Sequence, residues 1–378
     1  MSKASSAPRL PSVDHLLNRF MESHNVLGAA VAVARRGRLV HAAGYGRTSE
    51  AGGRPVVATD RFRIASVSKP VTAIAILRLW QEDRLRLDDA VADILELEPV
   101  DPRFRSITVE HLLHHTAGFD SAKSLDPMFA DVRIAGEQNV PLPIDQPTIV
   151  RFMLRQPLDF APGTRYAYSN FGYLLLGQVI QRVTDMAYDD YVRQHILAPL
   201  GIESMQLGRT AREHAARDEV RYLADHPERR YPSVLSPRRQ QVQGPYGNFH
   251  LEPMAAHGGW IASAPDLVRL ATALEGHSPT ELLSPAALER LRRRPACSRE
   301  GQPVYYGAGV QVRVVAPGTY NLWHNGSLDG TNSLWVLRHD DMAWTVLFNQ
   351  RYGRNRKPLS GLIDGPLHGA VDQAAVAN

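Results

Sequence analysis

The chain has 378 residues, 44% of them hydrophobic, which is enough for a full core in one large domain or two interleaved lobes. The net charge of +4 does not indicate a nucleic-acid-binding protein, because the arginine clusters are short, interrupted by acids and without interleaved aromatic residues. Cys297 is the only cysteine, so an intrachain disulfide is excluded.

The N-terminal segment has no apolar core of the kind found in a signal peptide. The longest apolar run, residues 26–34, has nine residues, whereas a membrane-spanning helix needs about 20. We therefore expect a protein of the cytoplasm with no membrane partner and no nucleic-acid partner. Residues 1–11 are expected to be a disordered N-terminus.

Periodic patterns predict strands near both ends of the chain and helices between them. Residues 13–23 have helical spacing, and residues 28–46 indicate a β-hairpin with its turn at Arg36-Gly37. A short strand at residues 61–65 leads into a helix from Lys69 to about Asp83. Further helices are expected at 108–114, 148–155, 171–184, 188–198 and 264–274, and further strands at 305–315, 319–326 and 331–350, the last with a turn at Asp340-Asp341.

This order of elements predicts an α/β fold of the α+β type, in which one antiparallel sheet is assembled from the two ends of the chain and flanked by helices. We expect a sheet subdomain of residues 12–80 and 258–375, with an inserted, mostly helical lobe of residues 81–257. Residues 120–147 and 209–257 are rich in proline, glycine and charge, and are long for loops. They are candidate rims of a substrate cleft.

Ser66 and Lys69 lie in the segment RIASVSKPVTAIAIL, where the short strand gives way to a helix. Residues i and i+3 of a helix share a face, so the hydroxyl and the amine can meet. An amine activates a serine only when its pKa is lowered, and a change from ~10.4 to near 7 disfavours the charged form by roughly 4 kcal/mol. The N–H groups at the helix start favour an oxyanion beside Ser66. The pair alone is weak evidence, because such spacing often arises by chance.

A second group, Tyr168, Ser169 and Asn170, stands immediately before a strongly apolar helix in RYAYSNFGYLLLGQVIQRV. An N-cap function would explain Ser169 or Asn170 without any catalysis. It does not explain Tyr168, whose phenol, if it lies near Lys69, would serve as base for Ser66 and then as acid for the leaving group. Asn170 would hydrogen-bond Lys69 and the acyl amide of a substrate.

The third group is LWHNGSLDG on a late strand, residues 322–330. Gly326 would let a ligand approach the backbone closely, and the N–H of Ser327 would be a second oxyanion donor beside that of Ser66. A β-turn containing Asn325-Gly326 is the alternative interpretation.

In this order, the three groups resemble the motifs of the serine β-lactamase and penicillin-binding-protein superfamily, and specifically its class C-like branch of family VIII carboxylesterases, D-aminopeptidases and related acyltransferases. The similarity continues through ITVEHLLHHTAGF, ILAPLGI and HGGWIASAPDLVRLA. It implies a β-lactamase/transpeptidase-like catalytic domain over residues 12–352. It also implies Ser66 as the acylated nucleophile, Lys69 and Tyr168 as a coupled base and acid, and Asn170 as the residue that orients them. Which of the coupled pair holds the proton stays open.

The third motif departs from the pattern of class C β-lactamases, which usually have lysine where this chain has His324. Histidine is largely neutral above its unperturbed pKa of ~6.5, so a permanent charge for a substrate carboxylate is missing and penicillin hydrolysis is disfavoured. If the charge of His324 matters, activity on carboxylate-bearing substrates should rise toward pH 6. By the resemblance, His324, Asn325, Gly326 and Ser327 bind the substrate and its oxyanion.

Other chemistries find little support in the sequence. His111, His114 and His115 have helical spacing, but no glutamate completes H-E-x-x-H, and capping around His115-Thr116 explains them better than a metal site does. Neither G-x-S-x-G nor a nucleotide-binding motif occurs. We expect no cofactor and no metal.

The sequence therefore predicts a serine hydrolase that forms an acyl-enzyme on Ser66 and acts on small esters, or on amides. Alternatives are an acyltransferase of secondary metabolism, a D-aminopeptidase or amidase, and a weak β-lactamase. A non-catalytic ligand-binding relative fits least, because it has no physical reason to retain a buried lysine. The expected partner is a small ester or amide substrate, and the oligomeric state is left open.

Overall fold

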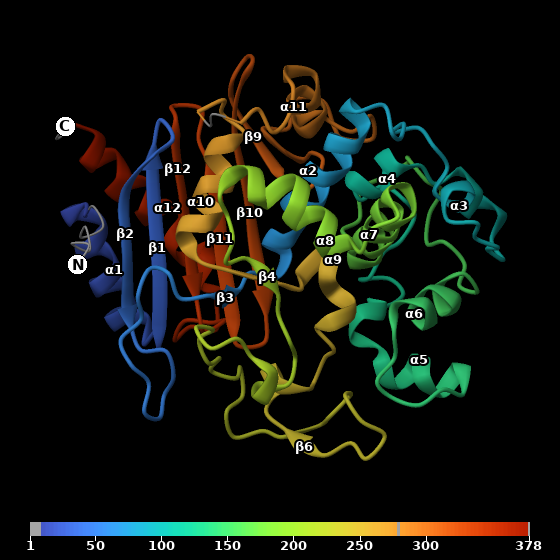
Figure 1. Cartoon of the computed structure of the whole chain (residues 1–378), viewed down its shortest axis with the longest axis horizontal. Helices are drawn as coiled ribbons and strands as arrows, with labels where there is room; N and C mark the ends of the chain where they lie inside the picture. The colour runs from blue at the N-terminus through green and yellow to red at the C-terminus, as the bar shows by residue number, and fades with distance from the viewer. Residues whose placement is uncertain (1–8, 278–279, 377–378) are drawn as a thin grey trace.

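The computed structural model describes residues 9–277 and 280–376, and an antiparallel sheet of seven strands lies at its centre (Figure 1). The strand order is β2-β1-β12-β11-β10-β9-β8. The strands are β1 (Gly28–Arg35), β2 (Arg38–Gly46), β8 (Val304–Tyr306), β9 (Gln311–Ala316), β10 (Thr319–Leu328), β11 (Thr331–Leu337) and β12 (Met342–Phe348). Because β1 pairs with β12, the sheet joins the two ends of the chain, as expected from the sequence.

Helices cover both faces of this sheet (Figure 1). Helices α1 (Pro11–His24) and α12 (Leu359–Val376) pack against each other on one face, and α10 (Ala264–Ala273) packs on β1, β11 and β12 from the other. Every residue of β11 and β12 is buried as a result. A strand with no solvent face carries long apolar runs instead of strict alternation.

The helical lobe lies beyond α10 (Figure 1). Its helices are α3 (Val91–Ile94), α4 (Val109–Leu113), α5 (Asp131–Gln138), α6 (Gln146–Met153), α7 (Asn170–Thr184), α8 (Tyr188–Val192) and α9 (Ala255–Gly258). Helix α2 (Ser68–Gln81) packs against α7, α9 and α11 (Pro285–Arg292), and 11 of its 14 residues are buried. The turn η1 (Ala65–Val67), directly before α2, packs on β10, β11 and α9. The beginning of α2 is therefore held between the sheet and the lobe.

A small sheet supports the approach to this turn. It consists of β3 (Phe62–Arg63), β7 (Trp260–Ala262) and β4 (Gln206–Leu207), and a separate pair joins β5 (Tyr231–Pro232) to β6 (Gln241–Val242). The guanidinium of Arg63 is buried and donates to the carbonyl oxygens of Pro245 at 2.6 Å and Arg209 at 2.8 Å. Its Nε lies 3.7 Å from a carboxylate oxygen of Glu219. Arg63 thus anchors residues 209–257 beside the strand that leads to Ser66.

Several elements differ from the sequence-based expectation. Residues 120–147 are not one loop, since they contain α5 and the start of α6; α5 buries only Asp131, Ile134 and Ala135, too few for a clear periodic signal. The helix expected over 188–198 is α8 followed by a π turn and a 3₁₀ turn. The strand expected over 61–65 ends at Arg63, because the backbone turns at Ala65.

Helix α12 is absent from the predicted elements for a physical reason. It contains Pro366 and three glycines, which are poor helix formers. Its burial compensates, because Leu359, Ile363, Leu367 and Val371 recur every four residues and all contribute to the core beneath the sheet. Tertiary packing here overrides local propensity.

Residues 1–8 of the segment expected to be disordered lie outside the described residues. The side chain of Leu10 is buried, its N–H donates to Nδ1 of His41 at 2.9 Å, and α1 begins at the next residue. Among the described residues, no helix combines the length and the apolar character needed to cross a membrane. The cytoplasmic location and the subdomain limits stay predictions.

Candidate active site

Ser66 lies on the turn η1 beside a residue with an unusual backbone. Ala65 has a φ of +46°, a left-handed conformation that costs an L-residue roughly 1–2 kcal/mol. The preceding residue is held on both sides, because Ile64 N–H donates to the Trp260 carbonyl at 3.0 Å and Ser333 Oγ donates to the Ile64 carbonyl at 2.8 Å. These contacts fix the turn that presents Ser66 to a cavity.

Lys69 is fully buried beneath this cavity. Its Nζ donates to Ser66 Oγ at 3.2 Å, to Asn170 Oδ1 at 2.8 Å and to the His257 carbonyl at 3.1 Å. Burial lowers the pKa of Lys69 to about 7, and the nearby Asp126 carboxylate opposes this effect. The lowered pKa makes the neutral amine accessible near pH 7, and in that form Lys69 donates to Asn170 and to the His257 carbonyl and accepts from the Ser66 hydroxyl.

Tyr168 completes this group. Nζ of Lys69 lies 4.6 Å from the centroid of the Tyr168 ring, and Tyr168 lines the same cavity as Ser66. Burial raises the pKa of Tyr168 well above its usual value, and the nearby Ser66 side chain only partly offsets this rise. The phenol therefore keeps its proton at neutral pH. The structure brings together the alcohol, amine and phenol that the sequence places in two distant segments.

The loop that carries Tyr168 is fixed by its neighbours. Ser169 is the N-cap of α7, since its Oγ accepts from Gly172 N–H at 3.3 Å. The N–H of Ser169 in turn donates to Nδ1 of the buried His115 at 3.2 Å. The ring centroids of His115 and Tyr168 lie 4.3 Å apart. Because Ser169 serves as the cap, the side chain of Asn170 is free to reach Lys69.

The opposite end of the Asn170 amide meets a residue that the sequence did not indicate. Asn170 Nδ2 donates to Asp126 Oδ2 at 2.6 Å. Asp126 precedes the short turn η3 (Pro127–Phe129) and also accepts from Met128 N–H at 3.1 Å. In the sequence, an aspartate before a proline indicates a cap or a turn and nothing more.

Strand β10 brings the third motif to the other side of the turn that holds Ser66. A side chain at Gly326 would overlap the Ile64 carbonyl oxygen and the Ser333 hydroxyl, so only glycine allows the strand to lie this close. Asn325 and Gly326 pair with Leu334 and Ser333 of β11, so the alternative of a β-turn at these residues is wrong.

His324 is buried and fully hydrogen-bonded within the protein. Its Nδ1 lies 2.7 Å from the Asn325 carbonyl, and a carbonyl only accepts, so Nδ1 carries the proton. Nε2 therefore accepts from the Tyr306 hydroxyl at 3.0 Å. Burial, with a contribution from nearby Lys69, lowers the pKa of His324 to about 3. The structure therefore argues against the expected gain of charge toward pH 6, because both ring nitrogens are hydrogen-bonded and burial disfavours the charged imidazole.

The cavity around these residues has a volume of about 360 Å³. Of the predicted site residues, those that line it are Ser66, Tyr168, Asn170, His324, Asn325 and Ser327. Lys69 and Gly326 are not among the lining residues. Lining residues that sequence reasoning missed are Phe129, Met254, His257, Gly258, Gln311, Leu328 and Arg351. They come from segments far apart in the chain, and no local pattern connects them.

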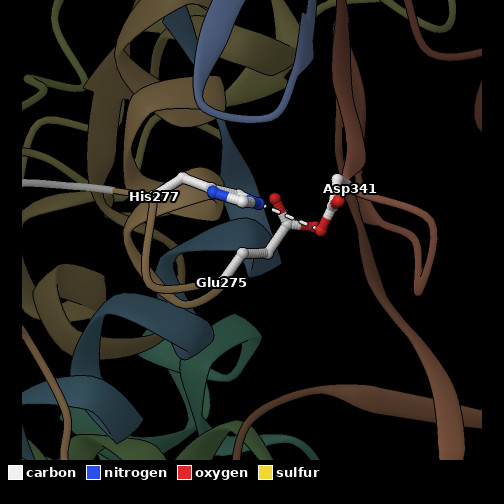
Figure 2. A group of neighbouring side chains, drawn as sticks. All are labelled: Glu275, His277 and Asp341. Atoms are coloured by element: carbon white, nitrogen blue, oxygen red, sulfur yellow. Dashed lines mark hydrogen bonds and ion pairs between the residues drawn. The ribbon is translucent and has the colours of Figure 1, made fainter.

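Potential metal ligands gather elsewhere. Among residues 9–277 and 280–376, Glu275, His277 and Asp341 form the one such group, with candidate ligand atoms within 4.8 Å of one another (Figure 2). His277 Nε2 lies 3.0 Å from Asp341 Oδ1, and these side chains are 29% and 40% exposed. None of the three lines the cavity of Ser66. His111 belongs to no such group: its Nδ1 accepts from Thr108 N–H at 3.2 Å as a helix cap.

The sequence profile of the Beta-lactamase family matches residues 13–364. The chain belongs to the Beta-lactamase family. The predicted superfamily and fold class are thereby confirmed, and the chain is a member of a family of serine hydrolases that includes esterases and amidases.

Three similar proteins illustrate the range of this family. The putative fimbrial assembly protein FimD, serogroup D, of Dichelobacter nodosus is 29% identical over 92% of this chain and 80% of its own length. Esterase EstB of Burkholderia gladioli is 31% identical over 53% of this chain and 52% of its own length. The structure of a D-stereospecific amidohydrolase from Streptomyces sp. has a TM-score of 0.67 and 26% identity, covering 92% of this chain and 96% of that one.

Proposed function

We propose that this protein is a hydrolase of small carboxylic esters that forms an acyl-enzyme on Ser66. The observation that carries the proposal is the buried amine of Lys69, 3.2 Å from the Ser66 hydroxyl and with a pKa of about 7. A serine needs such a base to become a nucleophile. The similarity to esterase EstB supports an ester as substrate.

Acylation begins when neutral Lys69 takes the proton of Ser66 as Oγ attacks the ester carbonyl carbon. Of the two coupled groups, Lys69 is the acceptor available at neutral pH, because burial lowers the pKa of its ammonium to about 7 and raises that of the Tyr168 phenol, which keeps its proton. Tyr168 donates its proton to the leaving alkoxide as the carbon–oxygen bond breaks, and regains one from Lys69. An alcohol departs and Ser66 carries the acyl group. Water then attacks the acyl-enzyme and releases the carboxylic acid.

The oxyanion is stabilised by the N–H groups of Ser66 and Ser327. Strand β9 pairs with β10 only as far as Trp323, so residues 324–328 have a partner strand on one side alone. Alternate N–H groups of this stretch are then free for a ligand. Gly326 lets the strand come within reach of the carbonyl that Ser66 attacks.

An amide is the second candidate substrate, supported by the similarity to the D-stereospecific amidohydrolase. The same three side chains would cleave it, with Tyr168 donating to the leaving amine. Acyl transfer differs only in the acceptor of the acyl group. Efficient β-lactam hydrolysis is disfavoured, because neutral His324 provides no charge for a substrate carboxylate and the cavity-lining Arg351 is paired with Asp225. The class C-like assignment stays a prediction.

Intact-mass spectrometry tests this function. The protein is incubated with a fluorophosphonate probe and, separately, with a panel of p-nitrophenyl esters, D-amino-acid amides and cephalosporins. We expect a single adduct that Ser66→Ala abolishes, while Ser124→Ala, which alters an exposed serine outside the cavity, leaves it unchanged. Esters should turn over fastest. An unlabelled Ser66, or full ester turnover by Ser66→Ala, would refute the proposal and favour a ligand-binding protein.

A further inference from the structure

We propose that Asp126 is a positioning residue of this site, which fixes the Asn170 amide and thereby holds Lys69 in place against Ser66. The inference rests on the function proposed above and adds a residue outside the three motifs. It is drawn from a continuous chain of contacts, from Asp126 to Asn170 to Lys69 to Ser66.

The first argument is the direction of the Asn170 amide. This side chain has one accepting oxygen and one donating NH₂ group, so its orientation decides which of them faces Lys69. An ionised carboxylate only accepts, and Asp126 Oδ2, 2.6 Å from Asn170 Nδ2, therefore selects the NH₂ group. The oxygen is left to accept from Lys69 at 2.8 Å. If the amide turned over, two donors would face each other in a buried place.

The second argument is that Asp126 is itself held rigidly. Its other oxygen, Oδ1, accepts from Met128 N–H at 3.1 Å, which fixes the carboxylate at the start of η3. Phe129, at the end of the same turn, lines the cavity. The turn therefore ties the rim of the cavity to the residues beneath Ser66.

The third argument is electrostatic. The titratable groups that interact electrostatically with Lys69 or whose rings lie near its Nζ are Asp126, Tyr168, Tyr173, His115, His257 and His324. Burial lowers the pKa of each of these histidines, and it raises the pKa of each tyrosine, so all five rings are neutral near pH 7. Asp126 is the carboxylate that raises the pKa of Lys69 against the effect of burial. Burial raises the pKa of Asp126, and the bond from Asn170 opposes that rise.

Two substitutions separate the effect of Asp126 on the orientation of the Asn170 amide from the effect of its charge on Lys69. Asp126→Asn keeps an accepting oxygen for Asn170, removes the charge and gives up the bond that the second oxygen accepts from Met128 N–H. Asp126→Ala removes both oxygens and the charge. Asp131→Asn is the matched control, because Asp131 is a buried carboxylate in the same segment and does not line the cavity. For each variant, kcat and KM for p-nitrophenyl acetate are measured from pH 5 to 9, together with fluorophosphonate labelling of Ser66 and thermal unfolding.

In Asp126→Asn, kcat/KM at high pH should stay near the wild-type plateau. The acidic limb of the pH profile, where kcat/KM falls as Lys69 is protonated, should move to lower pH, because removal of an anion lowers the pKa of Lys69. In Asp126→Ala, we expect kcat to fall about 10²-fold with little change in KM, as misplacement of a catalytic group does. Asparagine thus rescues the plateau that alanine loses. Asp131→Asn should leave both the plateau and the limb unchanged.

Wild-type kcat and an unmoved acidic limb in both Asp126 variants would overturn the inference. A lowered unfolding temperature with an unmoved limb would do the same, because it indicates a structural contribution alone. If Asp126→Ala does not fold, the isosteric asparagine variant still reports on the limb. The proposed function is judged on the wild-type protein: absence of labelling at Ser66 there refutes both, whereas normal labelling with unaffected variants refutes only the inference.

Discussion

The hydroxyl of Tyr306 donates to Nε2 of His324 over 3.0 Å, on the wall of the cavity that contains Ser66. Because Nδ1 of the same ring donates to the Asn325 carbonyl, neither nitrogen is available to pick up a proton without breaking a buried hydrogen bond. The imidazole is therefore a neutral structural link between β8 and β10, and not a replacement for a lysine.

This relationship predicts that substrate charge does not introduce a pH dependence between pH 5.5 and 8. With a His324 pKa of about 3, the ring gains no charge in this range. The measurement compares kcat/KM for a neutral ester and for the same ester bearing a carboxylate. Their ratio should be constant. A rise of this ratio on acidification would mean that His324 becomes protonated and that the hydrogen bond from Tyr306 does not persist.

The pH–rate profile for a neutral ester should report the titration of Lys69. The free amine is the base, and burial places its pKa at about 7, so kcat/KM should level off above pH 7 and fall roughly tenfold per unit below it. Lys69→Met should reduce kcat/KM at every pH by about 10³-fold or more. Lys123→Met, at an exposed lysine, serves as the control. An acidic limb at pH 5 in the wild type would contradict this assignment.

Gly326→Ala should show whether activity depends on the close approach of β10 to the turn that holds Ser66, separately from any effect of the substitution on stability. The added methyl group would overlap the Ile64 carbonyl and displace β10 from the turn that holds Ser66, so we expect ester turnover to fall about 10²-fold or more. Gly361→Ala is the matched control: nothing lies near a methyl group there, and alanine in α12 should stabilise the protein by about 0.5–1 kcal/mol. Activity and urea unfolding are measured for both. Normal turnover by Gly326→Ala would show that β10 is not held against this turn.

Arg63→Met should lower the free energy of unfolding by about 3–5 kcal/mol, because it leaves the buried Glu219 carboxylate without its cation and removes the donors that hold Pro245 and Arg209. Urea unfolding is the measurement. Arg86→Met, which alters an exposed ion pair, should leave the unfolding midpoint unchanged. Equal midpoints for the two variants would indicate that residues 209–257 are anchored by other contacts.

Features that depend on neighbouring residues could be predicted from the sequence. The hairpin turn at Arg36-Gly37, the late strands and the proximity of Ser66 to Lys69 all follow from local periodicity or spacing. The family could be predicted in the same way, because its motifs are short segments in a fixed order. Helix α12 could not, since its glycines and Pro366 argue against a helix until packing on the sheet is taken into account.

Contacts between distant segments could not be predicted from local sequence patterns. Asp126 has the sequence context of a simple cap, and it meets Asn170 only because the turn η3 packs against the start of α7. Tyr306 lies on β8, two strands away from His324 in the sheet order, and no spacing in the sequence indicates that their side chains touch.

The sequence by itself determined which chemical groups this protein has available: an alcohol and an amine three residues apart, a phenol before a helix and a glycine in a late strand. Only the tertiary structure decided their protonation. Removal of water from Lys69 and His324 lowers their pKa values to about 7 and about 3, which makes one a base and the other a neutral link. Desolvation depends on everything that packs around a group, and for this reason it is a property of the fold and not of any segment.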